Sequence, residues 1–384
     1  MSQEILSRWR KDSLSMGENL PKLTSIYFYL TEGCNLKCRH CWLAPRFDEK
    51  VKLPTLPVDL FQRAITEAKP LGLQSVKLTG GEPLMHPRFT DLLEIVRDED
   101  IGLAIETNGV LCTRETAKEI GKAPHSSVSV SIDGSDAETH EWMRGVAGCF
   151  EQSKQAVRNL VNAGIETEII MSLTRRNTDQ IEDVIRMAED LGASSVKFNI
   201  VQPTARGESF IKEGESFSVE HLIRLGHYTE EVIAKTTDLE LYFDYPNAFR
   251  SLSRIAKYGC GECAILNIIG VIASGHYALC GIGEHIKELV FGKVGKDNLD
   301  EVWGESVILK SLREGLPANL EGVCKHCILR KSCLGRCVAQ NYYTSKTLWS
   351  PFWFCDEAYK EGLFPDNRLW GILDQPFFKN QTKS

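Results

Sequence analysis

The sequence predicts an α/β protein: a partial (β/α)6 TIM-type barrel followed by a small cysteine-rich domain. From residue 24 onward, runs rich in β-branched and aromatic residues alternate with stretches of helical periodicity, which is typical of a parallel sheet covered by helices. Six such units are two fewer than a closed eight-stranded barrel contains, so we expect an open barrel. Beyond residue 236 cysteines become frequent, which indicates a second domain of different chemistry.

The elements follow in order along the chain. Strands are expected at residues 24–30, 75–79, 102–107, 127–132, 167–173 and 195–201. Helices are expected at residues 58–71, 88–97, 114–121, 150–163, 178–191 and 219–235. In the first helix, apolar residues recur at helical spacing. The chain thus divides into an N-terminal arm (1–23), the barrel (24–236) and a cysteine-rich domain with a C-terminal tail (237–384).

Composition excludes several classes of protein. With 384 residues the chain is long enough for two domains, and 42% hydrophobic and 25% charged residues exclude a disordered chain. A net charge of -7 does not suggest a general nucleic-acid-binding surface. The 13 cysteines are an odd number, and no signal peptide or long apolar run is evident. We therefore expect a cytoplasmic protein that binds neither nucleic acid nor a membrane, and whose clustered cysteines bind metal or do chemistry.

Polar and glycine-rich motifs follow the first four strands. Strand one leads into a cysteine loop, and the next three lead into TGGEP (79–83), ETNG (106–109) and SIDG (131–134). Because the carboxyl ends of barrel strands meet at the face where active sites form, we expect these motifs to build one site.

The cysteine loop has the spacing Cys34-x3-Cys38-x2-Cys41. Three sulfurs leave one position open in a site that needs four ligands, and an external molecule binds at an open position. A zinc loop completed by His40, and three unrelated core cysteines, are the alternatives.

The motif CNLKCRHCW resembles the signature of the radical SAM superfamily, and it follows the first barrel strand as in that family. The resemblance covers about residues 24–360. It implies that Cys34, Cys38 and Cys41 bind a [4Fe-4S] cluster whose fourth iron holds S-adenosylmethionine. Reductive cleavage then produces methionine and a 5'-deoxyadenosyl radical.

The same resemblance implies a set of cofactor-binding residues. The GGEP loop is expected at the methionyl ammonium, Thr107, Asn108 and Ser131 at the methionine or ribose, Arg144 at the methionyl carboxylate and Trp42 near the adenine. The loop consists of Gly80, Gly81, Glu82 and Pro83. A surface position for Arg144 and core packing for Trp42 are the alternatives.

Eight further cysteines lie between residues 260 and 355, enough for two closed sites of four ligands each. Their C-x2-C pairs suit zinc as well as iron-sulfur clusters. The pattern resembles the SPASM extension, which holds two auxiliary [4Fe-4S] clusters. The resemblance assigns Cys260, Cys263, Cys280 and Cys337 to cluster I, and Cys324, Cys327, Cys333 and Cys355 to cluster II. With four ligands at each site, an electron-transfer or structural role is expected.

The SPASM resemblance also implies a substrate class. Such proteins most often mature ribosomal peptides by crosslinking, epimerisation or similar reactions, and the segment 27–45 is similar to SPASM proteins of SynChlorMet cassettes. Sulfatase-maturating relatives carry an Asp base where this chain has Gly281, which disfavours that activity. Because only 23 residues precede the first strand, a leader peptide is expected to need a separate leader-binding protein or another surface, and an electron donor such as ferredoxin or flavodoxin is expected.

Other hypotheses remain open. They are a radical SAM enzyme that modifies a tetrapyrrole of the haem or haem d1 type, a non-catalytic iron-sulfur electron carrier and a zinc-stabilised scaffold. Cys112 and Cys149 are unassigned, and each is the kind of residue that packs in a core. The sharper hypothesis is that one donates a hydrogen atom to a substrate radical, and Cys112 is favoured because it follows strand three.

Overall fold

A computed structural model of the protein describes residues 20–47, 53–259 and 263–370. All six expected strands are present and pair in parallel in chain order. Their bounds are β1 Ser25–Tyr29, β2 Ser75–Thr79, β3 Gly102–Thr107, β4 Ser126–Ser131, β5 Glu166–Leu173 and β6 Ser195–Ile200. The partial parallel barrel is therefore confirmed.

Four short strands that the sequence analysis did not predict extend the sheet on both sides. β7 (Glu240–Phe243) pairs with β6, and β8 (Ile268–Val271) pairs in parallel with β1. β9 (His276–Ala278) and β10 (Val290–Lys293) continue antiparallel from β8. Among the described residues the sheet has the order β10-β9-β8-β1-β2-β3-β4-β5-β6-β7, which is open at both ends. Runs of three or four residues are too short for a periodic signal, which explains why they were missed.

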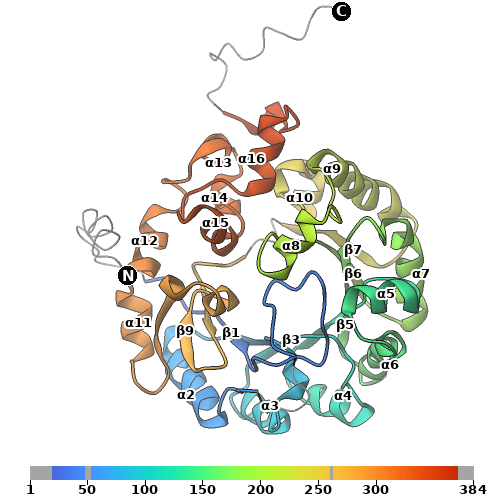
Figure 1. Cartoon of the computed structure of the whole chain (residues 1–384). Coiled ribbons are helices and arrows are strands. Elements are labelled where there is room, and N and C mark those ends of the chain that lie inside the picture. Colours follow the sequence, from blue (N-terminus) through green and yellow to red (C-terminus); the bar gives the residue numbers. More distant parts are fainter. Residues whose placement is uncertain (1–19, 48–52, 260–262, 371–384) are drawn as a thin grey trace, which may run out of the picture. The chain divides into compact units, whose positions relative to one another are not determined.

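Helices cover the outer side of the curved sheet (Figure 1). Five of the expected helices are α2 (Val58–Ala68), α3 (Phe89–Asp98), α4 (Arg114–Ile120), α6 (Cys149–Asn162) and α7 (Ile181–Leu191). The helix expected at residues 219–235 begins as α9 (Val219–His227), but it continues as a π turn and a 3₁₀ turn. The sequence analysis missed α5 (Ala137–Arg144), which carries Arg144.

The remaining helices are short. They are α8 (Arg206–Lys212), α10 (Leu252–Tyr258), α11 (Leu299–Glu305), α12 (Val307–Gly315), α13 (Gly322–His326), α14 (Arg330–Cys333), α15 (Val338–Ser345) and α16 (Trp353–Lys360). Within the described ranges, no helix is long and apolar enough to cross a membrane.

The two faces of the sheet differ in chemistry. Alternate residues such as Phe28, Leu78 and Ile105 are buried under the outer helices. The register places polar residues of neighbouring strands on the other face, where Lys77 and Glu106 form an ion pair of 2.7 Å and remain half-buried. TIM barrels ordinarily fill this side with apolar layers, so a polar inner face is a departure from a packed core.

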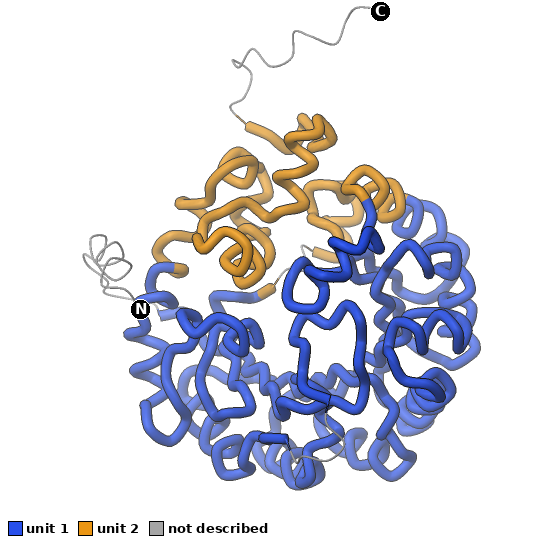
Figure 2. Tube along the Cα trace, viewed as in Figure 1, with its two compact units in different colours: residues 1–217, 228–244, 264–311 blue, residues 218–227, 245–263, 312–384 orange. Residues whose placement is uncertain are grey.

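The chain forms two compact units (Figure 2). Unit 1 comprises residues 1–217, 228–244 and 264–311, and unit 2 comprises residues 218–227, 245–263 and 312–384. Unit 1 thus includes β7 to β10, which lie beyond the expected barrel boundary at residue 236. Unit 2 carries most of the cysteines of the C-terminal set. The domain boundaries expected from the sequence remain a prediction.

Candidate active site

The cysteine loop after β1 and the GGEP loop after β2 are bound directly to each other. The backbone N–H of Gly81 donates to the carbonyl of Thr31 at 3.0 Å, and that of Glu82 donates to the carbonyl of Gly33 at 2.9 Å. A Cβ atom at position 81 would lie 1.9 Å from the Gly33 carbonyl oxygen. Glycine is therefore required at position 81 by the close approach of two backbones.

A pocket of ≈ 230 Å³ opens at this junction. Gly80 and Gly81 line it together with Tyr29 of β1, residues on both sides of the cysteine loop (31–32 and 43–46), Glu284 and His285. Concave sites at the carboxyl ends of barrel strands are where ligands bind in this architecture. The binding of the cofactor at this glycine pair stays a prediction.

The three cysteines of the loop lie close together. Cys34 and Cys38 are each 8% exposed, Cys41 is half-buried, and all three pack in one cluster with Leu36 and Cys149. Burial raises the pKa of the Cys34 and Cys38 thiols, and the charge of Cys41 raises both further. Three thiolates at this spacing need compensating positive charge, which a bound metal cluster provides. The donor set therefore fits the expected cluster.

Unpartnered polar atoms near the loop fit a polar ligand. Among the described residues, buried polar atoms without a hydrogen-bond partner include Nδ1 of His40, Oδ1 of Asn199, Oγ1 of Thr204 and Nε of Arg206. Buried polar groups ordinarily find a partner, so these atoms indicate that a further molecule or water completes the site. Burial lowers the pKa of His40 to about 4. The charges of Arg144 and Arg206 lower it further, whereas the charge of Asp133 acts in the opposite direction.

Glu82 fastens the GGEP loop to the end of β3. The carboxylate is 1% exposed and accepts hydrogen bonds from Oγ1 of Thr107 at 2.6 Å and from the backbone N–H of Asn108 at 2.9 Å. A third hydrogen bond comes from the backbone N–H of Leu84 at 3.1 Å. Burial raises the pKa of Glu82, while these donors act in the opposite direction. The expected cofactor residues Glu82, Thr107 and Asn108 therefore form one hydrogen-bonded unit.

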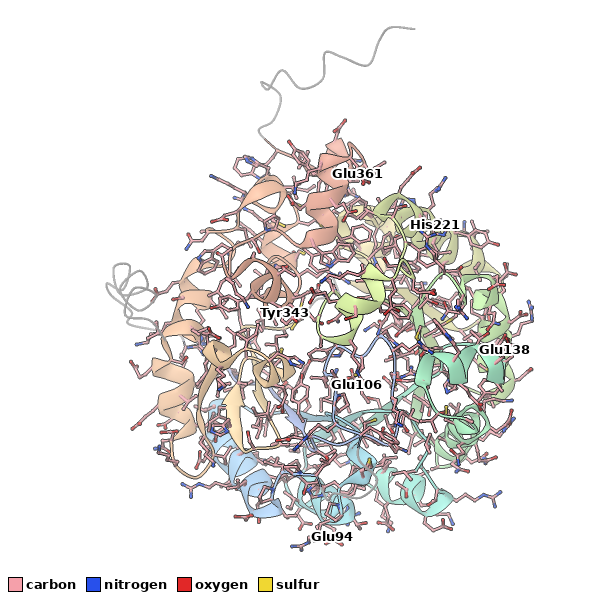
Figure 3. All side chains as sticks on the ribbon, in the orientation of Figure 1. Glu94, Glu106, Glu138, His221, Tyr343 and Glu361 are labelled. Carbon is pink, nitrogen blue, oxygen red and sulfur yellow. The ribbon has the colours of Figure 1, made fainter. Side chains whose placement is uncertain are left out.

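We predict that Glu82→Gln destabilises the protein by about 1–3 kcal/mol, because an amide NH₂ replaces an oxygen that accepts a buried hydrogen bond. The measurement is the urea midpoint of the anaerobically purified protein. Glu94→Gln on the exposed face of α3 is the matched control (Figure 3) and is expected to leave the midpoint unchanged. Equal midpoints for the two variants would show that the three hydrogen bonds of Glu82 contribute little.

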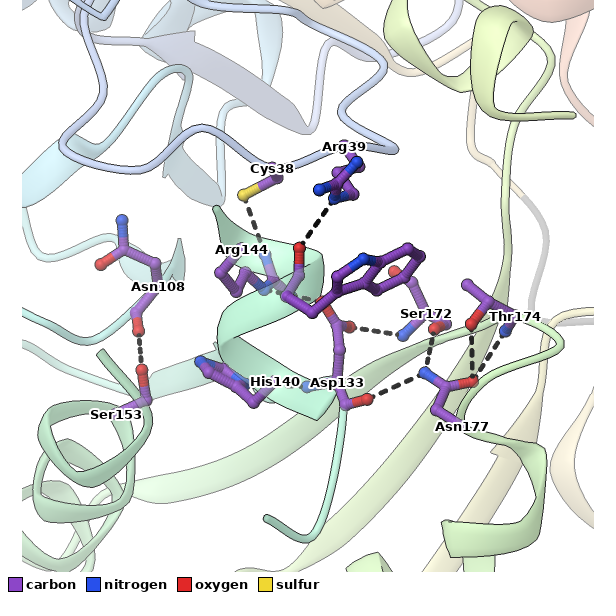
Figure 4. Close-up of polar contacts among 11 residues, drawn as sticks. Cys38, Arg39, Asn108, Asp133, His140, Arg144, Ser153, Ser172, Thr174 and Asn177 are labelled. Carbon is purple, nitrogen blue, oxygen red and sulfur yellow. Dashed lines mark hydrogen bonds and ion pairs between the residues drawn. The ribbon is translucent and has the colours of Figure 1, made fainter. Parts of the chain in front are cut away.

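Asn108 links the end of β3 to the cysteine loop. Its Nδ2 donates to Oδ1 of Asn35 at 2.8 Å and lies 3.8 Å from Sγ of Cys34. Oγ of Ser153 on α6 donates to the Asn108 carbonyl at 2.7 Å (Figure 4). The asparagine amide thus meets the first cysteine, and Asn35 and Ser153 hold it there. Sequence reasoning singled out neither of these two partners.

Arg144 is buried rather than on the surface. The residue is 6% exposed, and its guanidinium forms an ion pair of 2.7 Å from Nε to Asp133 and places Nη1 3.6 Å from Sγ of Cys38 (Figure 4). Asp133 was within the SIDG motif, but it was not among the candidate residues. The expectation that Arg144 meets the methionyl carboxylate stays a prediction.

The other candidates lie in different surroundings. Ser131 ends β4 on the inner face and is half-buried. Trp42 packs edge-on against Tyr29, with ring centroids 6.4 Å apart, in a cluster that includes Ile272 and Ala278. Cys112 is 5% exposed, and burial raises its pKa to about 12. The sequence analysis favours Cys112 over Cys149 as a hydrogen-atom donor. In the structure it is Cys149 that packs against Cys34 and Cys38.

Within unit 2, the four cysteines assigned to cluster II line one pocket. Cys324, Cys327, Cys333 and Cys355 converge from α13, the turn after it, α14 and α16. Burial raises the pKa of Cys355, and the thiols of Cys324 and Cys333 raise it further. Arg336 acts on Cys355 in the opposite direction, as Arg330 and Arg368 do on Cys327. Four thiols beside three cations match, in number and in charge, the ligand set that the sequence analysis assigns to cluster II.

No group of three or more His, Cys, Asp or Glu side chains in the described part of the chain is arranged to hold a single metal ion. In a [4Fe-4S] cluster each cysteine binds a different iron, so the sulfurs stand further apart than the ligands of one zinc ion. The four cysteines of unit 2 surround a pocket, and their ligation of a cluster remains a prediction.

The set assigned to cluster I is distributed along the chain. Cys260 lies outside the described residues, Cys280 belongs to unit 1, and Cys263 and Cys337 belong to unit 2. Cys337 precedes α15 and is not among the residues that line the cluster II pocket. Its assignment to cluster I remains a prediction.

The Radical SAM superfamily profile matches residues 28–188, which include the cysteine loop and the motifs after β2, β3 and β4. Together with the site geometry, this match shows that residues 28–188 form a Radical SAM domain, and enzymes with this domain use S-adenosylmethionine and a [4Fe-4S] cluster.

Particular relatives span nearly the whole chain. An AdoMet-dependent heme synthase of Methanosarcina barkeri is 29% identical and aligns over 84% of this chain and 93% of its own length. The mycofactocin maturase MftC of Mycobacterium ulcerans is 26% identical over 86% of this chain and 87% of its own. Streptococcus suis SuiB, solved with its precursor peptide SuiA, shares the fold with a TM-score of 0.69 at 19% identity. That structure covers 91% of this chain and 78% of SuiB.

Proposed function

We propose that this enzyme abstracts a hydrogen atom from a peptide and so takes part in the maturation of a ribosomal peptide, by a crosslink, an epimerisation or a similar reaction. When bound, the cluster and S-adenosylmethionine supply the 5'-deoxyadenosyl radical, for which an external donor such as ferredoxin or flavodoxin provides one electron. The chain's own residues hold the three cysteines in place, orient the cofactor beside Gly80 and Gly81 and position the substrate.

The polar inner face of the sheet is the observation that carries the peptide assignment. Tyr27, Lys77, Glu106, Glu168 and Lys197 face this side and are half-buried. A peptide presents an amide N–H and a carbonyl at almost every residue, and such a wall satisfies them. A tetrapyrrole macrocycle presents a large apolar surface, for which a mainly apolar pocket is expected.

The relatives include proteins named for peptide pathways and one named for haem synthesis. Mycofactocin maturase and the Bacillus subtilis subtilosin biosynthesis protein AlbA carry names of peptide pathways. The heme synthase of Methanosarcina barkeri is the observation that keeps a tetrapyrrole as the second candidate.

The position after Cys280 argues against sulfatase maturation. An aspartate base is expected there in sulfatase-maturating relatives, and this chain has Gly281. A Cβ atom at Gly281 would lie 2.2 Å from the ring of Tyr29. The ring therefore occupies the space that an aspartate side chain would need.

The test is anaerobic incubation with S-adenosylmethionine, a strong reductant and the short peptide encoded nearest the gene, followed by mass spectrometry. Formation of 5'-deoxyadenosine with a mass change of the peptide is the expected result. 5'-Deoxyadenosine without a peptide change, but with a mass change of an added tetrapyrrole of the haem type, would transfer the assignment to the tetrapyrrole. A separate leader-binding protein is added in a parallel reaction, because we propose that one presents the peptide.

We also propose that unit 2 holds cluster II on Cys324, Cys327, Cys333 and Cys355, and that Cys260, Cys263, Cys280 and Cys337 hold cluster I. Cys355→Ala is expected to lower the iron content by about 1 to 4 atoms per chain, because the proposed cluster loses one of its four cysteine ligands. Iron analysis and the absorbance of the thiolate-to-iron charge-transfer bands measure the loss of iron. Tyr359→Ala on the exposed side of α16 is the control. An unchanged iron content in Cys355→Ala would contradict the ligand set.

Cys112 is proposed as the donor of a hydrogen atom to the substrate radical. If it is, Cys112→Ala is expected to leave 5'-deoxyadenosine formation intact. The yield of any peptide product that requires return of a hydrogen atom to the substrate radical is expected to fall. Mass spectrometry in deuterated water reads this directly, because the thiol hydrogen exchanges with solvent. An unchanged product that still gains deuterium would assign the donor elsewhere, with Cys149→Ala as the comparison.

A further inference from the structure

We infer that the buried Asp133–Arg144 pair raises the reduction potential of the cluster at the cysteine loop: Asp133 acts as a positioning residue, and Arg144 as the charged donor to Cys38. The inference rests on the proposed ligation of that cluster by Cys34, Cys38 and Cys41. It assigns a role to Asp133 that concerns the cluster itself and not the peptide.

Asp133 is held rigidly. Its side chain is fully buried, and Oδ1 accepts the backbone N–H of Ser172 at 2.8 Å. Its own backbone N–H donates to Nδ1 of His140 at 3.1 Å, and its carbonyl accepts Nδ2 of Asn177 at 2.8 Å. These contacts come from β5, α5 and the loop after β5, so the carboxylate has one orientation (Figure 4).

The remaining oxygen, Oδ2, forms an ion pair with the guanidinium. It lies 2.7 Å from Nε of Arg144, and the ion pair holds Nη1 of the same guanidinium 3.6 Å from Sγ of Cys38. The planar fork of arginine can meet an acceptor on each of two edges, which a lysine ammonium cannot do with the same geometry. Burial of Asp133 raises its pKa, but the charge of Arg144, the nearby histidines and the hydrogen bond from Ser172 together hold the pKa below its usual value. Both members are therefore charged.

The end of α5 also forms hydrogen bonds with the backbone on either side of Cys38. The last-turn carbonyls of Met143 and Arg144 accept the N–H groups of Arg39 and Lys37, each at 3.0 Å. Gly145 follows with a φ of 71°, and a Cβ atom there would lie 2.8 Å from the Lys37 carbonyl. Helix-end carbonyls ordinarily lack partners, and here the cysteine loop supplies them. The guanidinium and the thiol are thus placed by the same helix end.

The charge at Cys38 differs from that at Cys34. The nearest side-chain donor to Cys34 is the neutral amide of Asn108 at 3.8 Å, whereas Cys38 meets a cation. A reduced cluster carries one more negative charge than an oxidised cluster. Hydrogen bonds to cysteine sulfur and nearby positive charge stabilise the reduced form, and therefore raise the potential. Asp133 lies behind the guanidinium, so the positive end of the pair faces the sulfur.

The experiment measures the midpoint potential of the cluster by EPR-monitored titration without S-adenosylmethionine, so that any contact of Arg144 with the cofactor carboxylate has no influence. The double variant Asp133→Leu/Arg144→Met removes both charges together, because removing one partner of a buried pair leaves an uncompensated charge that endangers folding. Asp133→Glu keeps both charges but displaces the guanidinium by the added methylene. Each is expected to shift the potential to more negative values.

The control is Arg97→Met/Glu119→Leu, which removes an ion pair between α3 and α4 and is expected to leave the potential unchanged. An unchanged potential in both test variants overturns the inference. A shift in the double variant alone assigns the effect to charge and overturns the positioning role of Asp133. Absence of the EPR signal from the double variant, with Asp133→Glu at the wild-type potential, also overturns it. Peptide modification is measured in a separate experiment. If the protein does not modify a peptide, the measured reduction potentials still test this inference.

Discussion

Cys38→Ala is expected to abolish the formation of 5'-deoxyadenosine. The replacement leaves two cysteines for a site that needs three, and it removes the sulfur that meets Arg144. Iron content is expected to fall by about 4 atoms per chain, whereas the clusters proposed for the C-terminal cysteines remain. The measurements are iron analysis, the EPR signal of the reduced protein and chromatography of the nucleoside product.

Cys149→Ala is the matched control for this prediction. Cys149 is also buried, at 1% exposure, and packs in the same cluster as Cys34 and Cys38, but it begins α6 instead of belonging to the cysteine loop. The variant is expected to keep its iron and its nucleoside product. A variant of Cys38 that retains both, or a variant of Cys149 that loses both, would contradict the proposed ligand set.

Gly81→Ala is expected to lower the rate of S-adenosylmethionine cleavage by about 100-fold or more, because misplacement of a site by about 1 Å has an effect of that size. The new methyl group would lie 1.9 Å from the Gly33 carbonyl oxygen, so one of the two loops has to move. Either movement displaces the cysteine loop or the edge of the pocket beside Gly80. Overpacking of this kind also costs about 1–3 kcal/mol of stability.

Gly304→Ala in α11 is the control for the glycine. A Cβ atom there meets nothing within 4 Å, and alanine favours a helix more than glycine does. We expect wild-type cleavage and unchanged or higher stability. The rate of 5'-deoxyadenosine formation and the affinity for S-adenosylmethionine measure both variants, and wild-type values for Gly81→Ala would show that the loop contact is not needed.

The strands that form the barrel were predictable, because each has at least five residues with buried alternate positions. β7 to β10 were not, since each has four residues or fewer, and β8 also pairs with β1, which is distant in the sequence. Local periodicity carries no information about such pairing.

α5 was missed although its end signals are present. The side chain of Asp136 accepts the backbone N–H of Thr139 at 2.8 Å, and Gly145 adopts the left-handed conformation that ends helices. The helix is polar apart from a few positions, and His140 and Arg144 are buried in it. An apolar stripe was therefore not available, and the caps were the signal that would have located it.

The sequence by itself determined the parts of the site that are close in the chain. The spacing of Cys34, Cys38 and Cys41 and the order of the motifs after successive strands are local, and they indicated a radical SAM enzyme before any contact was known. Tertiary structure decided which charges meet: Asp133 with Arg144, Arg144 with Cys38, and Glu82 with the end of β3. Such contacts depend on where a strand end and a helix end come together in space. In a buried site each charge needs a partner of opposite charge, and the tertiary positions decide which residue is that partner.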